Sequence, residues 1–442
     1  MFKSYIMIIA FKVKNFRSFK EEAVLSLEAS GSKAKLDNIA EVITAAGKTF
    51  RLLKSIVIYG ANASGKSNVI KAYWAFRQLI VSSFRNDIND DIKLAEPFLL
   101  APETIIKPSE FTLNFIGWDK RQYIYYVSLS RTDGIIEETL KYYPKHLPKI
   151  VFKRKGRNII TRNPDIFKQN SQTDKINPKR LFLSELGNSG DEYWEQMRNY
   201  FVLGTNAVNA IAAPVIQAMS QNARRLFEHT DPQSTIIKEQ VVRMIRVADL
   251  GIKSLKLVEE ERIVKSPVEN EDSFSGPVKT KVFKTYHDVF ENHRVVDERE
   301  FDLAKQGSTG TFSLVGLSTE IFLSLNFRYG KPLWIDEFNN SLHPYLCRFL
   351  ISLYHHPKSN PNNAQLIFAT HETTLLDKNY FRKDQIYITT KDRYGCSNLY
   401  SIYDLELEGL RDDIPFDKWY MAGKFGGLPR IKELDFIFER EH

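Results

Sequence analysis

The chain has 442 residues, of which 43% are hydrophobic and 26% charged, and its formal net charge is +8. This composition excludes a disordered or fibrous chain, and the length exceeds what one ordinary hydrophobic core requires. The two cysteines, Cys347 and Cys396, fit no C-x-x-C metal pattern, so we expect a reducing, cytoplasmic setting. The apolar run at residues 5–11 is shorter than the roughly 20 residues that span a bilayer, so no membrane insertion is expected.

The N-terminal third of the chain is predicted to contain several strands. Residues 9–13 and 23–27 alternate apolar and polar side chains, as half-buried strands do. Residues 111–115 and 122–129 alternate with the same period, and the second of these runs carries three tyrosines. That pattern indicates a pair of antiparallel strands.

A phosphate-binding loop is predicted between an apolar strand at residues 55–59 and a helix over residues 67–81. Residues 60–68 read Gly-Ala-Asn-Ala-Ser-Gly-Lys-Ser-Asn, which fits G-x-x-x-x-G-K-[ST]. Glycines let backbone N–H groups wrap around phosphate oxygens, Lys66 reaches the β- and γ-phosphates, and the Ser67 hydroxyl can ligate Mg²⁺. A Gly- and Ser-rich turn without function is the plainer alternative, which the intact Lys-Ser pair disfavours. The predicted ATP-binding residues are Gly60, Asn62, Ser64, Gly65, Lys66, Ser67 and Asn68.

The middle of the chain combines a basic stretch with predicted helices. Residues 145–180 contain eleven Lys or Arg residues and only two Asp, a distribution that suits phosphate-backbone binding. A solvated basic loop, or a surface that docks an acidic protein, explains the same charges, and these alternatives stay open. Helical spacing of apolar residues predicts helices over residues 193–225 and 234–248.

Two further motifs predict how a bound nucleotide is hydrolysed. Residues 306–311 (Gln-Gly-Ser-Thr-Gly-Thr) precede an amphipathic helix over residues 312–325 and form a second anion-binding helix N-terminus. Residues 332–338 are an apolar strand that ends in two acids, a Walker B pattern. Asp336 is predicted to hold Mg²⁺, and Glu337 to act as the general base for the attacking water. A charged turn after an edge strand is the structural alternative.

A last strand, residues 365–369, ends at Thr370 and His371. A histidine after a strand is usually a surface or capping residue. A functional role for His371 is indicated only by its order and spacing relative to the other motifs. The adjacent His355 and His356 point to different faces of any helix, and we expect both to be exposed.

In the order and identity of these motifs the chain resembles the ABC/SMC-type ATPases, and within them the AAA-type group of abortive-infection and overcoming-lysogenization-defect proteins. The resemblance covers both ends of the chain and is weak between residues 161 and 302. The matching segments are residues 13–19 (Val-Lys-Asn-Phe-Arg-Ser-Phe), the phosphate loop, Ser308-x-Gly310-Thr311, Asp336-Glu337 through Leu342-His343-Pro344, Thr370-His371, and residues 420–429 (Tyr-Met-Ala-Gly-Lys-Phe-Gly-Gly-Leu-Pro).

The resemblance implies an α/β fold: an ABC-type, RecF/SMC-like P-loop ATPase head with an inserted, mostly helical domain. We expect residues 1–160 and 303–442 to form the head and residues 161–302 the insertion. In the resembled family two copies enclose ATP in a sandwich, so Ser308, Gly310 and Thr311 of one copy would contact the nucleotide held by the other. His371 would sense the γ-phosphate within its own copy, as a catalytic partner of Glu337.

The leading hypothesis is an ATP-hydrolysing switch, with ATP and Mg²⁺ as cofactors, that acts in bacterial anti-phage defence as a homodimer or higher homo-oligomer. Nuclease relatives need an Asp-x-Asp motif, and none occurs after His371. A separate effector, a nuclease or toxin, is therefore expected. A RecF-like DNA-repair ATPase and a nucleotide-dependent scaffold without activity are the alternatives. A transporter subunit is disfavoured because the signature lacks Leu-Ser-Gly-Gly-Gln.

Overall fold

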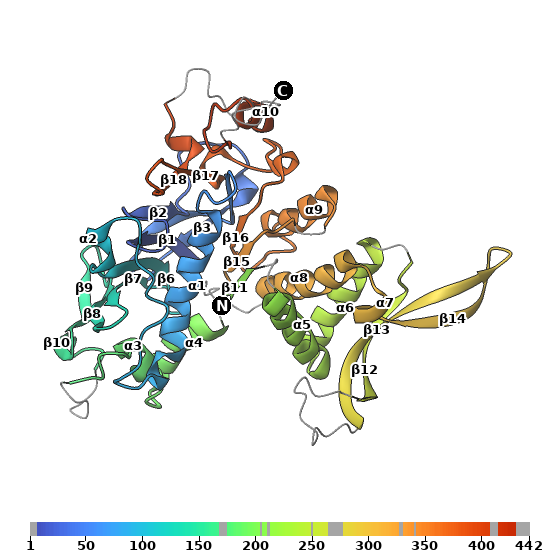
Figure 1. The fold of residues 1–442 in the computed structure, drawn as a ribbon, viewed down its shortest axis with the longest axis horizontal. Coiled ribbons are helices and arrows are strands. Elements are labelled where there is room, and N and C mark those ends of the chain that lie inside the picture. The colour runs from blue at the N-terminus through green and yellow to red at the C-terminus, as the bar shows by residue number, and fades with distance from the viewer. Residues whose placement is uncertain are drawn as a thin grey trace, which may run out of the picture. The chain divides into compact units, whose positions relative to one another are not determined.

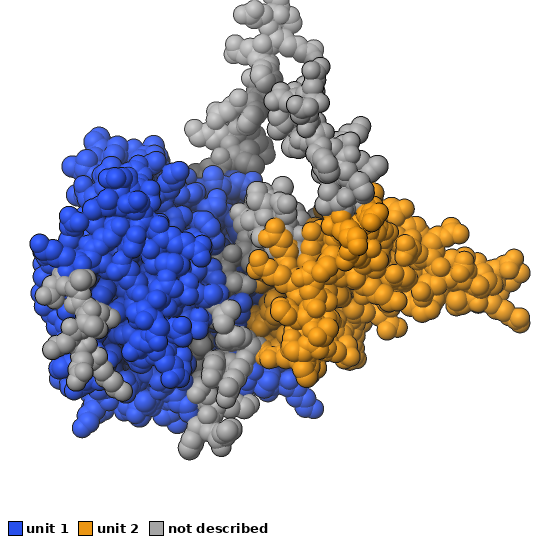
Figure 2. Space-filling view, turned by 90° about the horizontal axis from the view of Figure 1, so that it is seen from below, with its two compact units in different colours: residues 1–207, 327–338, 351–442 blue, residues 208–326, 339–350 orange. Residues whose placement is uncertain are grey.

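The structure is a computed structural model that describes residues 7–167, 175–203, 206–209, 213–248, 251–263, 277–326, 330–339, 342–406 and 414–429. The chain divides into two compact units, coloured separately in Figure 2. Unit 1 comprises residues 1–207, 327–338 and 351–442, and unit 2 comprises residues 208–326 and 339–350. Each unit therefore combines segments that are distant in sequence.

A largely parallel sheet crosses unit 1 (Figure 1). In sheet order its strands are β11 (Asn206–Asn209), β15 (Leu333–Asp336), β16 (Leu366–Ala369), β5 (Ser55–Gly60), β17 (Ile386–Lys391) and β18 (Ser397–Ser401). The strand β5 pairs in parallel with β16 and β17, and β16 pairs in parallel with β15. Every residue of β5, β15 and β16 is buried, which is typical of strands covered on both faces. The strand predicted to precede the phosphate loop is confirmed.

An antiparallel sheet lies beside it in unit 1. In sheet order its strands are β10 (Asn158–Arg162), β9 (Lys149–Lys155), β8 (Gly134–Tyr142), β7 (Gln122–Ser130), β6 (Ser109–Ile116), β1 (Met7–Lys14) and β2 (Ala23–Ser26). The predicted antiparallel pair is confirmed, since β6 and β7 pair along their whole length. A separate two-stranded sheet joins β3 (Ile39–Ile43) to β4 (Thr49–Leu53).

The helix α1 (Lys66–Ser82) packs between the two sheets of unit 1. Its Tyr73 ring stacks on Trp334 of β15 at a centroid distance of 4.1 Å. Phe11 of β1 meets both rings edge-on, at 5.4 Å from Tyr73 and 5.8 Å from Trp334. These fully buried aromatic rings join the antiparallel sheet, the helix and the parallel sheet into one core. The core fixes the helix N-terminus, and with it the phosphate loop.

Shorter elements complete unit 1. Its other helices are α2 (Pro102–Ile105), α3 (Phe182–Leu186), α4 (Glu192–Leu203) and α10 (Phe416–Met421), and α9 (Pro344–His355) runs from unit 2 into unit 1. Single 3-10 turns occur at η1 (Leu36–Asn38), η2 (Ser83–Arg85), η3 (Thr373–Leu375), η4 (Lys383–Gln385) and η5 (Ile402–Asp404). No helix within the described ranges has the length and apolarity needed to cross a membrane.

Unit 2 combines helices with a small sheet. Its helices are α5 (Ala213–Glu228), α6 (Pro232–Ala248), α7 (Leu303–Gln306) and α8 (Thr309–Asn326). The helix α8 packs against α5 and α6, where Asn222 donates to Glu320 at 2.6 Å and Asn326 to Gln240 at 2.7 Å. The three-stranded antiparallel sheet is formed by β12 (Ser254–Ile263), β13 (Pro277–Glu291) and β14 (Arg294–Asp302), and the β13–β14 hairpin projects from it (Figure 1).

Three expectations need correction. The single helix predicted over residues 193–225 is wrong, because α4 ends at Leu203, the strand β11 follows at Asn206–Asn209, and α5 begins at Ala213. The insertion that was expected to be mostly helical also contains a sheet, since the charged and β-branched residues of 254–263, 277–291 and 294–302 favour strands over helices. His355 is 8% exposed rather than solvated, and its Nε2 lies 2.8 Å from the Ser55 hydroxyl. Burial lowers the pKa of His355 to about 3, so the imidazole is neutral at physiological pH.

Candidate functional site

The motifs that unit 1 contributes meet at one edge of the parallel sheet. Gly60 ends β5, Asp336 ends β15, and Thr370 directly follows β16. These neighbouring strands run in parallel, so their carboxyl ends lie together, which is where α/β sheets place ligands. The Thr370 N–H donates to the Ile58 carbonyl at 3.2 Å and ties the histidine motif to the phosphate-loop strand.

The phosphate loop has a backbone that requires glycine at two positions. The φ angles of Gly60 and Gly65 are +151° and +123°. A Cβ on Gly60 would lie 2.4 Å from the Thr389 carbonyl oxygen, and one on Gly65 would lie 2.6 Å from Ser397 Oγ. Side chains at either position would therefore collide with the neighbouring strands, in addition to the strain of the backbone itself.

Lys66 is buried and turned toward the loop that precedes it. Its Nζ donates to the carbonyl oxygens of Gly60 at 2.8 Å and Ala61 at 3.0 Å. Burial lowers the pKa of the ammonium, and the carboxylates of Glu337 and Asp336 act against this shift. The carboxylates of the two Walker B acids therefore act on the charge of the phosphate-loop lysine.

Asp336 has the environment of a cation ligand. Its carboxylate is buried, which raises the pKa, while a hydrogen bond from the Ser67 hydroxyl and the charge of Lys71 act in the opposite direction. The Oδ1 atom is buried and has no hydrogen-bond partner among the residues that the structure describes. An unpaired buried carboxylate oxygen is costly, and a hard divalent cation would satisfy it together with the Ser67 oxygen. The residues predicted to hold Mg²⁺ therefore fit that ion.

Glu337 and His371 form a close pair. Glu337 Oε2 lies 2.5 Å from His371 Nε2, and the Glu337 side chain is 10% exposed against 45% for His371. Burial raises the pKa of Glu337, the charge of His371 opposes the shift, and the Asp336 charge adds to it. Glu337 also has a φ of +54°, a left-handed conformation that strains a non-glycine residue by about 1–3 kcal/mol. Strain and raised basicity at one carboxyl group suit a general base.

Residues that the motif patterns missed hold the phosphate loop in place. Ser397 Oγ lies 2.6 Å from the Ser64 carbonyl oxygen and 2.7 Å from Ser18 Oγ, which also accepts from Asn68 Nδ2 at 2.7 Å. Thr389 Oγ1 lies 2.5 Å from Ser64 Oγ. Serine and threonine carry no sequence signal for such a role. Only the pairing of β17 with β5 brings Thr389 opposite Gly60.

The N-terminal motif at residues 13–19 holds neighbouring backbone segments in place beside this loop. The Asn15 Nδ2 donates to the carbonyl oxygens of Thr104 and Lys107, both at 2.9 Å, and its Oδ1 accepts from the Phe98 N–H at 3.0 Å. Arg17 pairs with Glu96 at 2.7 Å. Beside these residues lies a cavity of about 900 Å³ that reaches Ser18 and Asn68 at the start of α1. This cavity adjoins the phosphate loop and is large enough for a nucleoside.

The C-terminal motif at residues 420–429 lies on another side of the loop. The rings of Tyr420 and Tyr59 are 5.7 Å apart, and the Tyr420 hydroxyl donates to the Gly427 carbonyl at 3.2 Å. Together with residues 389–393, this segment lines a cavity of about 820 Å³ that reaches Asn62 and Ser64. Residues 420–429, which carry part of the family resemblance, therefore line a cavity beside the phosphate loop.

The signature residues belong to unit 2. Ser308 directly precedes α8, its Oγ accepts from the Thr311 N–H at 3.0 Å, and the two hydroxyls are 2.8 Å apart. This is N-terminal capping of an 18-residue helix, and it leaves Ser308 exposed. Ser308, Gly310 and Thr311 therefore form a helix N-terminus of the kind that binds anions.

Much of the basic stretch at residues 145–180 is used inside unit 1. Arg154 is fully buried and pairs with Glu138 at 3.3 Å, while the buried Lys179 donates to the Thr132 carbonyl. Lys153 pairs with Glu137 at 3.1 Å. The exposed cations among the described residues are Lys145, Lys149, Lys155, Arg157 and Lys175, and Lys168 lies outside the described residues. The count of charges in the sequence therefore overstates the cationic surface.

Comparison with known families gives a match over most of the chain. Residues 55–377 match the family model described as "AAA domain, putative AbiEii toxin, Type IV TA system". The matched range runs from β5 to just beyond His371 and includes the phosphate loop, the signature and the Walker B acids. No curated protein matches the chain.

Solved structures with a similar arrangement include two SMC heads and a recombination mediator. The SMC head domain from Thermotoga maritima is 15% identical, with a TM-score of 0.37, over 90% of this chain and 99% of that one. An SMC head bound to the C-terminal winged-helix domain of ScpA is 15% identical, with a TM-score of 0.39, over 91% and 98%. RecF with ATP is 11% identical, with a TM-score of 0.40, over 90% and 99%.

Proposed function

The chain belongs to the AAA-domain family that residues 55–377 match, and we propose that it uses ATP as a switch that controls a separate effector. It is an ATP-hydrolysing enzyme with an ABC-type P-loop fold. The observation that carries the proposal is the set of exchangeable contacts around the phosphate loop. Lys66 binds loop carbonyls and Glu337 binds His371. A phosphate oxygen can replace the loop carbonyls as the acceptor at Lys66 and the Glu337 carboxylate as the acceptor at His371, so the same residues have two alternative arrangements.

The proposed chemistry assigns one role to each residue. The backbone of residues 60–68 wraps the phosphates, and Lys66 neutralises the β- and γ-phosphate charge. Ser67 and Asp336 would hold Mg²⁺, which when bound neutralises charge that develops on the phosphates. Glu337 accepts the proton of the attacking water at a carboxylate oxygen. His371 keeps Glu337 in place through its Nε2 contact and can turn toward the γ-phosphate.

We further propose that two copies share each site. Ser308, Gly310 and Thr311 form an anion-binding helix N-terminus in unit 2, and Ser308 is exposed. Placed against the Lys66-bound triphosphate of a second copy, these groups would supply additional donors to the γ-phosphate. Hydrolysis would remove their ligand and separate the copies, which gives the switch its output.

The biological proposal is that this switch acts in bacterial anti-phage defence and controls a nuclease or toxin encoded separately. Support comes from the family, whose description reads "putative AbiEii toxin, Type IV TA system".

A plaque assay tests this proposal. The chain is expressed with its neighbouring gene in a phage-sensitive host and compared with the Lys66→Ala form across a broad phage panel. We expect fewer plaques with the wild-type pair and full plaquing with Lys66→Ala. Equal plaquing in both, with both proteins shown to be expressed, would contradict the defence role. Sensitivity to DNA damage on deletion of the gene would then favour a RecF-like repair ATPase.

A further inference from the structure

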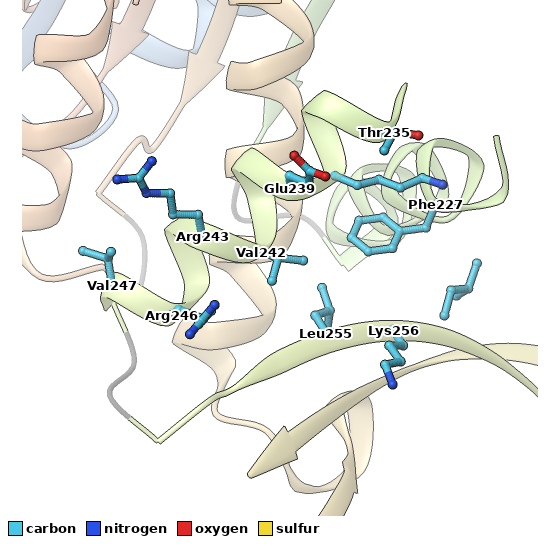
Figure 3. A pocket seen from close by; sticks show the side chains of 11 residues that line it. Phe227, Thr235, Glu239, Val242, Arg243, Arg246, Val247, Leu255 and Lys256 are labelled. Atoms are coloured by element: carbon cyan, nitrogen blue, oxygen red, sulfur yellow. The ribbon is translucent and has the colours of Figure 1, made fainter. Parts of the chain in front are cut away.

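A groove in unit 2, remote in sequence from the phosphate loop, has the composition of a peptide-binding site. It lies between α6 and β12, has a volume of about 870 Å³, and is shown in Figure 3. Its lining residues come from the end of α5, one face of α6 and the start of β12. They are Phe227, Thr235, Lys238, Glu239, Val242, Arg243, Arg246, Val247, Leu255, Lys256 and Leu257.

The floor of the groove is apolar. Figure 3 shows Phe227 from α5, Val242 from α6 and Leu255 from β12 around the same space. The Phe227 ring is held edge-on against Phe283 at a centroid distance of 5.2 Å, so the floor is fixed by packing. Val247 at the end of α6 is 65% exposed. Covering this apolar surface with an apolar side chain of a ligand lowers the free energy of the complex.

The rim of the groove is cationic. Among its lining residues Lys238, Arg243, Arg246 and Lys256 are basic, and Glu239 is acidic. Lys238 donates to the His229 carbonyl, and the Lys256 ammonium lies 4.5 Å from the centroid of the Tyr286 ring. Arg243 and Arg246 have no hydrogen bond or ion pair with any residue that the structure describes. Two guanidinium groups one helical turn apart are thus free to receive carboxylates.

We propose that this groove binds a short segment of a partner protein in which acidic residues alternate with large apolar ones. The apolar side chains would cover the floor, and the carboxylates would pair with Arg243 and Arg246. A nucleic-acid backbone would meet the charges but offers no apolar group to cover Val242 and the exposed Val247, so a peptide matches both properties of the groove. The inference rests on the proposed function in that the partner would be the separate effector.

Peptide selection tests the proposal without any need to know the partner. The full-length protein is panned against a phage-displayed dodecapeptide library, and selected peptides are synthesised and titrated by fluorescence anisotropy without nucleotide. We expect a consensus of Asp or Glu with Leu, Ile or Phe. The double variant Arg243→Glu/Arg246→Glu should bind these peptides at least ~10-fold more weakly, because rim charges that attract carboxylates become repulsive.

A matched control reverses two exposed arginines of α5 outside the groove. The Arg224→Glu/Arg225→Glu variant carries the same change in net charge and should bind within ~2-fold of wild type if the contact is local rather than a long-range field. Equal binding by wild type and the groove variant would overturn the proposal, as would the absence of an acidic-apolar consensus. Arginine-dependent binding of a 20-base-pair DNA duplex, with no peptide selected, would assign the groove to nucleic acid instead. ATPase activity is measured in parallel, so failure here is distinct from failure of the proposed function.

Discussion

Replacing Glu337 by glutamine tests the chemistry of the site with the least change in shape. Glutamine keeps an oxygen that can face His371 Nε2, which lies 2.5 Å from the native carboxylate, but it cannot accept a proton from water. Removing a general base costs ~10²–10⁴-fold in rate. That loss corresponds to about 2.7–5.4 kcal/mol of transition-state stabilisation. ATP affinity should persist because Lys66 and the loop backbone are unchanged.

The same variant has a signature in the pH profile. Burial raises the pKa of Glu337 above that of an exposed carboxyl group, so protonation should inactivate the base at a higher pH than it would in solvent. The wild-type rate should therefore be fully present above the raised pKa and fall as the pH drops through it. In Glu337→Gln this acidic limb should disappear from the residual activity.

The assay is steady-state phosphate release, with ATP binding measured separately on a fluorescent analogue. Glu372→Gln is the matched control, since Glu372 is next to His371 in sequence and caps the η3 turn by accepting from the Thr374 N–H at 3.1 Å. Glutamine can accept the same bond, so the control should hydrolyse ATP normally. A Glu337→Gln protein that hydrolyses ATP at the wild-type rate would refute the assignment of the base.

The remaining predictions concern binding, assembly and stability. Lys66→Ala should lose most ATP affinity in the same fluorescence titration, and unchanged affinity would remove Lys66 from the site. Mixing Lys66→Ala and Ser308→Arg proteins in equal amounts should restore about a quarter of the wild-type ATPase rate. About half of randomly formed dimers are mixed, and each mixed dimer keeps one of its two sites intact. No recovery of activity, with dimers present, would count against shared sites. Arg154→Met should lower the free energy of unfolding in urea by about 3–5 kcal/mol, since it leaves the charge of the buried Glu138 carboxylate without its cationic partner. Lys155→Met, at the exposed neighbouring position, serves as the control. Equal stability of Arg154→Met and Lys155→Met would contradict a stabilising buried ion pair at Arg154.

The sequence predicted the elements around the phosphate loop because their signals are local. The buried strand β5, the helix α1 and the Walker B strand β15 each follow from a few consecutive residues whose pattern has one physical interpretation. Their assembly at one sheet edge follows from the parallel pairing that such strand–helix alternation favours.

What escaped prediction depends on tertiary contacts. Ser397 and Thr389 support the phosphate loop only because β17 and β18 lie beside β5, and no local pattern marks either residue. The buried His355 was expected in solvent because its role depends on Ser55, 300 residues away. The strands β12, β13 and β14 were missed because they lie where the family resemblance is weak, in a segment expected to be mostly helical.

The central claim, an ATP-driven switch, is tested most directly by the molar mass of Glu337→Gln in solution. Light scattering coupled to gel filtration compares the variant with Mg²⁺ and ATP against the variant with Mg²⁺ and ADP. The account predicts a doubled mass with ATP alone, and a monomeric mass in both nucleotides once Ser308→Arg is added. A mass that is the same in ATP and ADP would contradict the switch.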